Sequence, residues 1–304
     1  MAENRALTSR AIIYMILSSL FFALMGVVIK DTEGIYLFQK ILFRNLIILF
    51  IIVFPMMKGR PWKQEKGWQI FTGKRENRKY LFWRAFFGQV GVFLYFYSVA
   101  NMSLTDSSIV NRLSPFFVTI FAVLFLKAKL SRFQIPVLLA AFLGALIVIR
   151  PRFDMPVWPA LAGIAASVTS GAAYTFLSFL GGREKPATII FWFSVLATLT
   201  SLPFAIVWWQ SPLPAQWLEL LAVGIFAAGG QYFLTLSYEK APAAEVSIYN
   251  YTHVPFSVLL GWFVFAEIPD FYSILGGSII IAAAFFLFVM EKREARHHSP
   301  SPKR

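Results

Sequence analysis

The side chains best suited to chemistry in this sequence are polar residues embedded in long apolar runs. Arg112 and Asn111 lie about two turns into the run 105–126, which is long enough to cross a bilayer. A guanidinium in such a place can hold a carboxylate or phosphate through a fork of hydrogen bonds. Because inserting a charge there costs at least about 2.5 kcal/mol, we predict that Arg112 contacts an anionic ligand. The alternatives are a structural pair with Asp106 or a side chain that reaches the membrane surface.

A second apolar run, 243–265, carries nearly the same polar pattern. At an offset of 139 residues, Asp106 corresponds to Glu245 and Asn111 corresponds to Asn250. Polar, proline-interrupted membrane segments at equivalent places in two halves of a chain indicate the binding site of a transporter. Both acids stand at expected helix starts, where they can either satisfy free N–H groups or take part in proton coupling.

Further polar and aromatic residues complete the candidate site. His253 shares a helix face with Asn250, and histidine as a residue type ordinarily titrates near neutral pH, so this side chain can contact substrate, carry a proton or simply pack between helices. Arg44 lies near the middle of its run, where substrate contact and structural bonding are equally expected. The predicted substrate-binding residues are Arg112, Asn111, His253, Asn250, Tyr249, Tyr95, Trp192 and Arg44. The candidates for ion coupling are Asp106, Glu245 and His253.

Ten apolar segments must position these residues, each close to the length of about 20 residues that a spanning helix needs. They are 11–29, 35–57, 81–100, 105–126, 132–149, 158–180, 187–209, 217–238, 243–265 and 270–290. Most connections between them are short, which favours antiparallel neighbours. The exception, 58–80, is basic and contains Trp62, Trp68 and Phe71, so we expect part of it to lie in the membrane interface.

The distribution of basic residues predicts the orientation of these segments. With the N-terminus in the cytoplasm, the cytoplasmic connections hold 21 Lys and Arg residues and the opposite connections hold 3. The other four of the 28 lie deeper within segments, namely Lys40, Arg44, Arg84 and Arg112, whereas Arg132, the first residue of its segment, is counted with the cytoplasmic connection before it. The excess on one side predicts that both termini are cytoplasmic.

The repeated pattern divides the chain into two units of five segments. We expect a cytoplasmic N-terminus at 1–10, a first repeat at 11–150, a second repeat at 158–290 and a basic cytoplasmic tail at 291–304. Because five is odd, the second unit starts on the opposite side of the membrane, so the units are inverted about an axis in the membrane plane. That axis is expected to place Asn111 and Asn250 on opposite sides of one central cavity.

The composition excludes several classes of protein. Of the 304 residues, 58% are hydrophobic and 14% are charged, which is typical of membrane proteins. The sequence has no cysteine for disulfides, thiol catalysis or metal binding, and its three histidines form no metal-ligand pattern. The net charge of +13 is distributed between apolar runs, so we expect contacts with lipid headgroups rather than nucleic acid. No nucleophile–base pair, paired carboxylates or nucleotide-binding loop indicates an enzyme, and no cofactor is expected.

A series of short motifs runs along both halves of the chain. The first half has Arg84-Ala85-Phe86-Phe87-Gly88, Phe96-Tyr97-Ser98-Val99-Ala100, Leu104-Thr105-Asp106-Ser107-Ser108, Pro115, and Gly144 before Arg150-Pro151. The second half has Tyr238-Glu239-Lys240-Ala241, Ala243-Ala244-Glu245, Pro255, Phe265-Ala266-Glu267-Ile268-Pro269 and Gly276-Gly277. This ordered set, on ten segments with an inverted repeat, resembles the EamA family of the drug/metabolite transporter superfamily.

The resemblance implies an all-α integral membrane protein with ten transmembrane helices, arranged as two inverted five-helix repeats. It implies a central cavity lined mainly by helices 1, 3, 4, 6, 8 and 9, and transport of small metabolites. The family usually ends its fourth helix with an acid, where this chain has Lys127. No role of that acid therefore carries over to the first repeat.

We therefore predict a secondary transporter of the inner (plasma) membrane that works by alternating access and meets membrane lipids and a small-molecule substrate. Basic residues outnumber acids within the segments, which favours an anionic or zwitterionic substrate such as an amino acid or a related metabolite. The alternative is an exporter of amines, drug-like compounds or nucleoside-containing compounds. An integral-membrane enzyme and a non-transporting scaffold remain as further alternatives. Both a monomer and a homodimer are compatible with the sequence.

Overall fold

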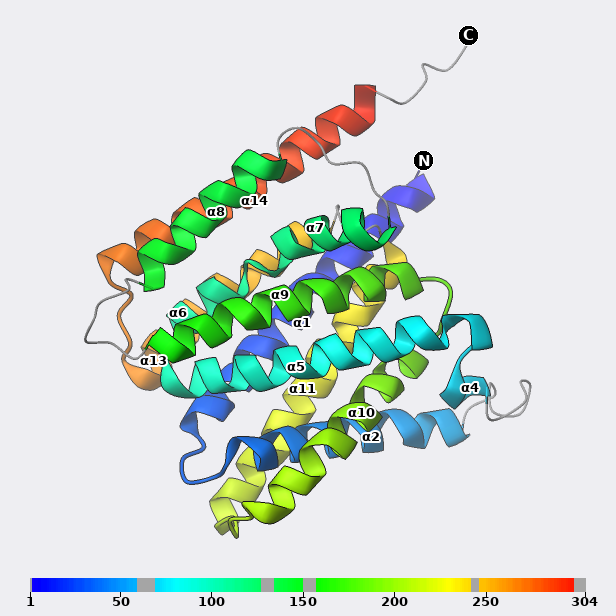
Figure 1. The fold of residues 1–304 in the computed structure, drawn as a ribbon, viewed down its shortest axis with the longest axis vertical. Coiled ribbons are helices and arrows are strands. Elements are labelled where there is room, and N and C mark those ends of the chain that lie inside the picture. Colours follow the sequence, from blue (N-terminus) through cyan, green and yellow to red (C-terminus); the bar gives the residue numbers. More distant parts are fainter. Residues whose placement is uncertain (1, 59–68, 127–133, 150–156, 242–245, 298–304) are drawn as a thin grey trace.

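The computed structural model describes residues 2–58, 69–126, 134–149, 157–241 and 246–297, and every regular element in these ranges is a helix (Figure 1). The first half contains α1 (Ala2–Asp31), α2 (Leu37–Lys58), α4 (Gln69–Thr72), the 3-10 helix η1 (Arg75–Asn77), α5 (Arg78–Asn101), α6 (Leu104–Asn111), α7 (Ser114–Leu126) and α8 (Gln134–Ile149). The second half contains α9 (Val157–Leu180), α10 (Pro186–Val207), α11 (Pro214–Lys240), the 3-10 helix η2 (Ser247–Thr252), α13 (His253–Phe265) and α14 (Phe271–His297).

Apolar composition decides which of these helices can cross a membrane. Within the described residues, five stretches are long and apolar enough: Ser9–Asp31, Leu37–Met57, Val157–Leu180, Pro186–Val207 and Pro214–Lys240. The other predicted segments coincide with α5, α6 and α7, α8, η2 and α13, and α14. Large apolar side chains such as Phe50 and Phe263 are more than 70% exposed on the surface of the bundle, where they suit contact with lipid tails. The all-α membrane fold is therefore confirmed.

The fourth and ninth predicted segments are interrupted rather than continuous helices. α6 ends at Asn111, and a turn containing Arg112 precedes α7. In the second half, η2 precedes α13, so the equivalent place is also irregular. Pro115 and Pro255 lie in the first turns of α7 and α13, where a helix needs no N–H donor. The proline-interrupted segment 105–126 thus consists of two helices, and Pro115 lies where the second of them begins.

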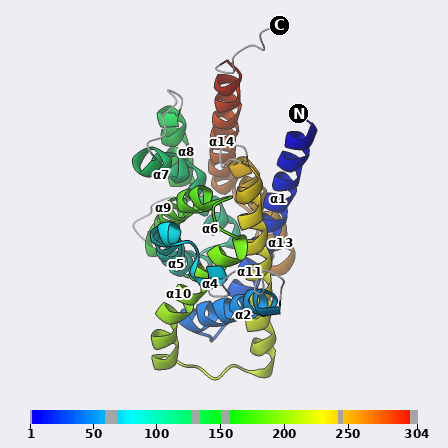
Figure 2. The ribbon, with the colours of Figure 1, turned by 90° about the vertical axis from the view of Figure 1, so that its right-hand side faces the viewer.

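The helix pairing is reciprocal between the two halves, as an inverted repeat requires. In the order of elements, α1 is equivalent to α9, and α5 is equivalent to α11. α1 packs on α11, and in the same way α9 packs on α5. α2 packs on its own counterpart α10, and α8 packs on α14, as the two views show (Figures 1 and 2). α6 meets α13 near the centre. The interrupted helices of the two repeats therefore face one another, at the interface where binding sites of inverted-repeat transporters lie.

Glycines allow the closest of these helix contacts. A Cβ atom at Gly144 of α8 would lie only 2.8 Å from the carbonyl oxygen of Gly276 on α14. A Cβ atom at Gly230 of α11 would lie 2.8 Å from the ring of Phe22 on α1. The absence of a side chain at Gly230 thus gives Phe22 the space it occupies beside the centre of the bundle.

Helical structure extends into both predicted terminal segments and into part of the long connection. α1 begins at Ala2, so the predicted tail 1–10 mostly continues the first helix. α14 extends to His297 and takes in half of the predicted tail 291–304. In the connection 58–80, the described part forms α4 and η1, whereas Trp62 and Trp68 lie outside the described residues.

Candidate functional site

A cavity lies among the interrupted helices and the helices around them. Its wall comes from α1, α2, α5, α9, α10, α11 and α13, and from the end of α6 with the turn that follows it. Its polar lining residues are Arg44, Arg84, Asn111, Arg112, Ser170, Gln231 and His253. Its aromatic lining residues are Phe22, Tyr95, Phe96, Tyr174 and Phe193. The volume of the cavity that water can occupy is about 70 Å³, which is enough for several water molecules. Compared with the helices expected from the resemblance, α2 and α10 are additional contributors.

Three arginines converge on this cavity and are almost completely buried. Arg44 and Arg84 are each 2% exposed, and Arg112 is 6% exposed. In the described part of the chain, no Asp or Glu lines the cavity and no ion pair joins these arginines to an acid. Removing an ion from water costs several kcal/mol, and unpaired positive charges in a cavity attract anions. The described lining of the cavity therefore carries positive charge without an acidic counterpart.

Arg112 links the two interrupted helices across the interface between the repeats. Its Nη1 donates to the backbone oxygen of Asn250 at 3.1 Å and to Asn250 Oδ1 at 2.6 Å. Its Nε is buried and finds no partner among the described residues. One edge of the guanidinium is thus fixed by η2, while the Nε edge remains available for a ligand.

The alternative pairing of Arg112 with Asp106 is not formed. The Oδ1 of Asp106 accepts a hydrogen bond from Ser273 Oγ at 2.6 Å, and its backbone N–H donates to Ser103 Oγ at 2.9 Å. Asp106 therefore stands in the first turn of α6 and ties that turn to α14, whereas the hydroxyl of Ser103 accepts from the free N–H at the helix start. Its sequence counterpart Glu245 lies outside the described residues.

Arg44 and Arg84 share one aromatic ring. Their guanidinium carbons lie 5.3 Å and 4.9 Å from the centroid of Phe193. Arg44 is the eighth residue of α2 and Phe193 the eighth of α10, so these two residues meet from equivalent places in the two repeats. A cation–π contact contributes about 0.5–2 kcal/mol, which is less than the several kcal/mol that burying each ion costs. The ring therefore positions the two cations without neutralising them.

Gly88 explains how Arg84 reaches this ring. Gly88 lies one turn after Arg84 on α5, and a Cβ atom there would lie 2.3 Å from Arg84 Nη1 and 3.0 Å from Phe193 Cε2. A side chain at this position would displace the guanidinium from the ring. The first and last residues of the motif Arg84-Ala85-Phe86-Phe87-Gly88 thus act together.

His253 connects the cavity to a buried hydrogen-bonded chain between α13 and α6. Its Nδ1 lies 3.0 Å from Ser257 Oγ, and Ser108 Oγ donates to Ser257 Oγ at 2.8 Å. Its Nε2 has no partner in the described part of the molecule, and the ring lines the cavity. The free ring nitrogen can therefore donate to or accept from a ligand, depending on the tautomer.

The structure gathers most of the predicted binding residues, but not all of them. Arg112, Asn111, His253, Tyr95 and Arg44 line the cavity. The sequence analysis did not include Arg84 or Phe193 among the site residues. Arg84 could have been found as a charge within an apolar segment, whereas nothing in the sequence singles out Phe193 from the other 32 Phe residues.

Three of the predicted binding residues lie beside the cavity rather than on its wall. Asn250 is bonded to Arg112, so it does not stand across the cavity from Asn111 as the repeat axis predicts. Tyr249 packs against the apolar cluster that contains Leu177 and Tyr238. Trp192 donates its Nε1 hydrogen to the carbonyl oxygen of Phe71 at 2.9 Å and so fixes the end of α4.

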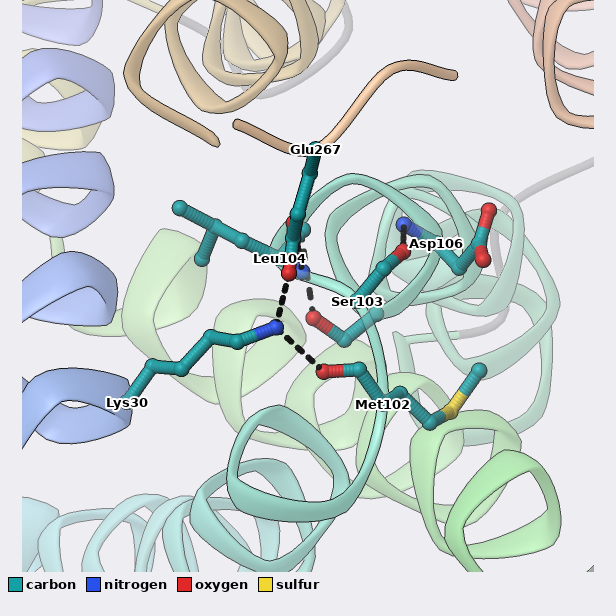
Figure 3. Close-up of polar contacts among 7 residues, drawn as sticks. Lys30, Met102, Ser103, Leu104, Asp106 and Glu267 are labelled. Atoms are coloured by element: carbon teal, nitrogen blue, oxygen red, sulfur yellow. Dashed lines mark hydrogen bonds and ion pairs between the residues drawn. The ribbon is translucent and has the colours of Figure 1, made fainter. Parts of the chain in front are cut away.

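One acidic side chain ties the two repeats together at the end of the bundle where α1, α5 and α13 finish (Figure 3). Glu267 forms an ion pair with Lys30, and its Oε2 accepts from the backbone N–H of Leu104 at 3.0 Å. Lys30 also donates to the carbonyl oxygen of Met102 at 3.0 Å. These contacts, termed the Lys30–Glu267 latch, join α1, the start of α6 and the segment after α13. The latch therefore holds α1, α6 and the segment after α13 together at this end of the bundle.

Comparison with known proteins places this architecture in a family. The EamA-like transporter family matches the chain twice, over residues 9–150 and 157–289. A solved crystal structure has the same fold with a TM-score of 0.66 at 15% identity, and the match covers 94% of this chain and 99% of that one.

Several curated relatives share this sequence along much of its length. The pseudopaline exporter CntI of Pseudomonas aeruginosa (strain UCBPP-PA14) is 29% identical, over 92% of this chain and 96% of its own. The riboflavin transporter of Rhizobium johnstonii is 34% identical, over 60% of this chain and 61% of its own. The human solute carrier family 35 member G1 is 24% identical, over 89% of this chain and 76% of its own. All three are named as transporters or carriers, not as enzymes. With both repeats matched and the expected helices in place, this chain is a multi-pass membrane protein that belongs to the EamA-like transporter family.

Proposed function

We propose that this protein moves a small anionic or zwitterionic metabolite across the membrane through the arginine-lined cavity. The observation that carries this proposal is the convergence of three buried arginines on a cavity without an acidic lining residue in the described chain. An amino acid or a related metabolite is the leading substrate class. Its carboxylate would meet the Nε edge of Arg112, and its ammonium would meet oxygen atoms of Asn111, Gln231 or Tyr95.

The inverted repeats support alternating access as the mechanism. In this scheme the repeats 11–150 and 158–290 rock against each other about the interrupted helices, and each repeat adopts in turn the conformation of the other. His253 and Asp106 are the described candidates for proton coupling, and Glu245 is a third candidate. The Lys30–Glu267 latch holds one end of the bundle closed in the present conformation. We infer that the protein lies in the inner (plasma) membrane. The excess of Lys and Arg in the connections on one side supports an orientation with both termini in the cytoplasm.

A second candidate is the export of a ring-containing compound, such as a nucleoside-containing or drug-like molecule. Five aromatic side chains line the cavity, and such rings can stack on a planar substrate. The relative named as a riboflavin transporter also favours this candidate.

Ligand-dependent stability of the purified protein tests the proposal. A ligand that binds the folded state raises the melting temperature by mass action. We expect anionic or zwitterionic metabolites to raise it for the parent protein and to lose this effect in Arg112→Gln. Arg78→Gln is the matched control, because Arg78 is an exposed arginine at the start of α5. Counterflow in proteoliposomes then shows whether the stabilising compounds are transported. Stabilisation by cationic amines alone would overturn the proposed substrate charge.

A further inference from the structure

We propose that Arg44, Arg84 and Phe193 form a second anion subsite, separate from Arg112, so that the substrate of this cavity carries two anionic groups. This inference rests on the proposed function and narrows its substrate class to dianionic metabolites such as dicarboxylates. One anionic group would be held between Arg44 and Arg84, and the other would be held by the free edge of Arg112.

The two subsites belong to different elements of the same cavity. Arg112 stands in the turn between α6 and α7, and its Nη1 is occupied by Asn250. Arg44 and Arg84 come from α2 and α5 and converge on Phe193 of α10. The lining of the cavity includes Arg44, Arg84, Arg112 and Phe193, so one ligand can contact both subsites.

The contact with Phe193 leaves the hydrogen-bond donors of Arg44 and Arg84 without an acceptor oxygen. A cation–π contact attracts the charge of a guanidinium to the face of the ring, but it supplies no acceptor for the N–H groups. The Nε atoms of both arginines are buried and have no partner among the described residues. The guanidinium of Arg44 donates only to the neutral Oδ1 of Asn45, at 3.0 Å, and the guanidinium Nε of Arg84 has no hydrogen-bond partner among the described residues. The donors of a fork for an anion are therefore in place and unused.

The charge balance favours an anion at this position over a neutral group. Two like charges are held within 5.3 Å of one ring centroid, where they repel each other in a medium less polar than water. A carboxylate between them would relieve the repulsion and pair with both cations. A ligand with a single anionic group would leave either this pair or Arg112 without a counter-charge, and a ligand with two groups matches both subsites.

The absence of a side chain at Gly88 makes room for this arrangement of the pair. The side chain of any other residue there would collide with Arg84 Nη1, since a Cβ atom would lie 2.3 Å from it. Arg84 and Arg44 are also among the largest fully buried side chains of the protein. A surface arginine held by chance on an aromatic ring would not be enclosed in this way.

The test compares dicarboxylates with monocarboxylates of the same chain length. Malonate, succinate, glutarate and adipate are titrated against propionate, butyrate, valerate and hexanoate, at fixed ionic strength and pH, with the purified protein in detergent. Melting temperature gives the apparent affinity of each compound. We expect at least one dicarboxylate to bind about tenfold or more tightly than its matched monocarboxylate, because a charge-assisted fork adds binding free energy of that order.

Five variants, one of them a control, assign the preference to residues. In Arg84→Gln and Arg44→Gln, the dicarboxylate should bind no better than the monocarboxylate, whereas Arg78→Gln should keep the preference of the parent. Arg112→Gln should weaken both kinds of ligand. Arg84→Lys keeps the positive charge but lacks the fork of N–H donors, and it replaces Arg84→Gln if that variant does not fold. We expect Arg84→Lys to have a reduced preference for the dicarboxylate over the matched monocarboxylate.

The possible failures separate this inference from the proposed function. The second subsite is refuted if no dicarboxylate outcompetes its matched monocarboxylate, or if Arg44→Gln and Arg84→Gln retain the parent's preference. If monocarboxylates bind and depend on Arg112 alone, the proposed function stands without the second subsite. If no carboxylate stabilises the parent protein, the proposed function fails as well.

Discussion

Removal of the negative charge from Glu267 should open the end of the bundle that the Lys30–Glu267 latch closes. The change Glu267→Gln keeps an oxygen that can accept from the backbone N–H of Leu104, but it removes the ion pair with Lys30. Gln and Glu have nearly the same size, so packing around the segment after α13 is preserved. The variant therefore isolates the electrostatic part of the latch.

The expected magnitude follows from the partial burial of the pair. The two side chains are 21% and 20% exposed, so their attraction exceeds that of a fully exposed pair, which contributes about 0.2–1 kcal/mol. A hydrogen bond to a charged group contributes about 1.5–3 kcal/mol, and the amide of Gln retains part of that. We expect the closed arrangement to lose about 1–2 kcal/mol, which raises the open population about 5–30-fold.

The cysteine-free sequence makes this population measurable. Ser170→Cys introduces one thiol into the cavity wall, and a membrane-impermeant maleimide is applied from the membrane face at which Glu267 lies. We expect the labelling rate to rise about 5–30-fold with Glu267→Gln, since labelling follows the open population. Glu33→Gln is the matched control, because Glu33 is an exposed acid near the same end of the molecule. Equal labelling rates in the parent, Glu267→Gln and Glu33→Gln would refute the role of the latch in closing this end.

Three further changes test the contacts that build the site. Gly88→Ala should destabilise the protein by about 1–3 kcal/mol, because a methyl group meets Arg84 and Phe193; an unchanged melting temperature would contradict this. Asn250→Ala removes one of the two acceptors of Arg112 and should cost about 1–3 kcal/mol in unfolding free energy, measured by denaturation in detergent, whereas a neutral effect would show that the backbone acceptor suffices. Trp192→Phe removes the hydrogen bond to the carbonyl oxygen of Phe71 and should therefore speed proteolysis near α4, while substrate binding stays at the parental level. Slower transport together with an unchanged rate of proteolysis would place Trp192 in the site instead.

The sequence by itself determined the membrane class and the arrangement of the segments. Long apolar runs can satisfy their backbone groups in lipid only as helices, so the composition of each run is enough to place it. The matching polar residues near Asn111 and Asn250 located the interrupted helices, and an odd number of segments per repeat required inversion. The position of the break was less evident, because a proline can either bend a helix or begin a new one.

Only the tertiary structure decided which polar residues act together. Arg112 and Asn250 are 138 residues apart, and Glu267 lies 237 residues from Lys30, so no local pattern links either pair. The meeting of Arg44 and Arg84 on Phe193 likewise depends on the packing of α2, α5 and α10. Hydropathy depends on each residue and its neighbours along the chain, whereas the partner of a buried charge depends on how separate helices rotate and pack against one another.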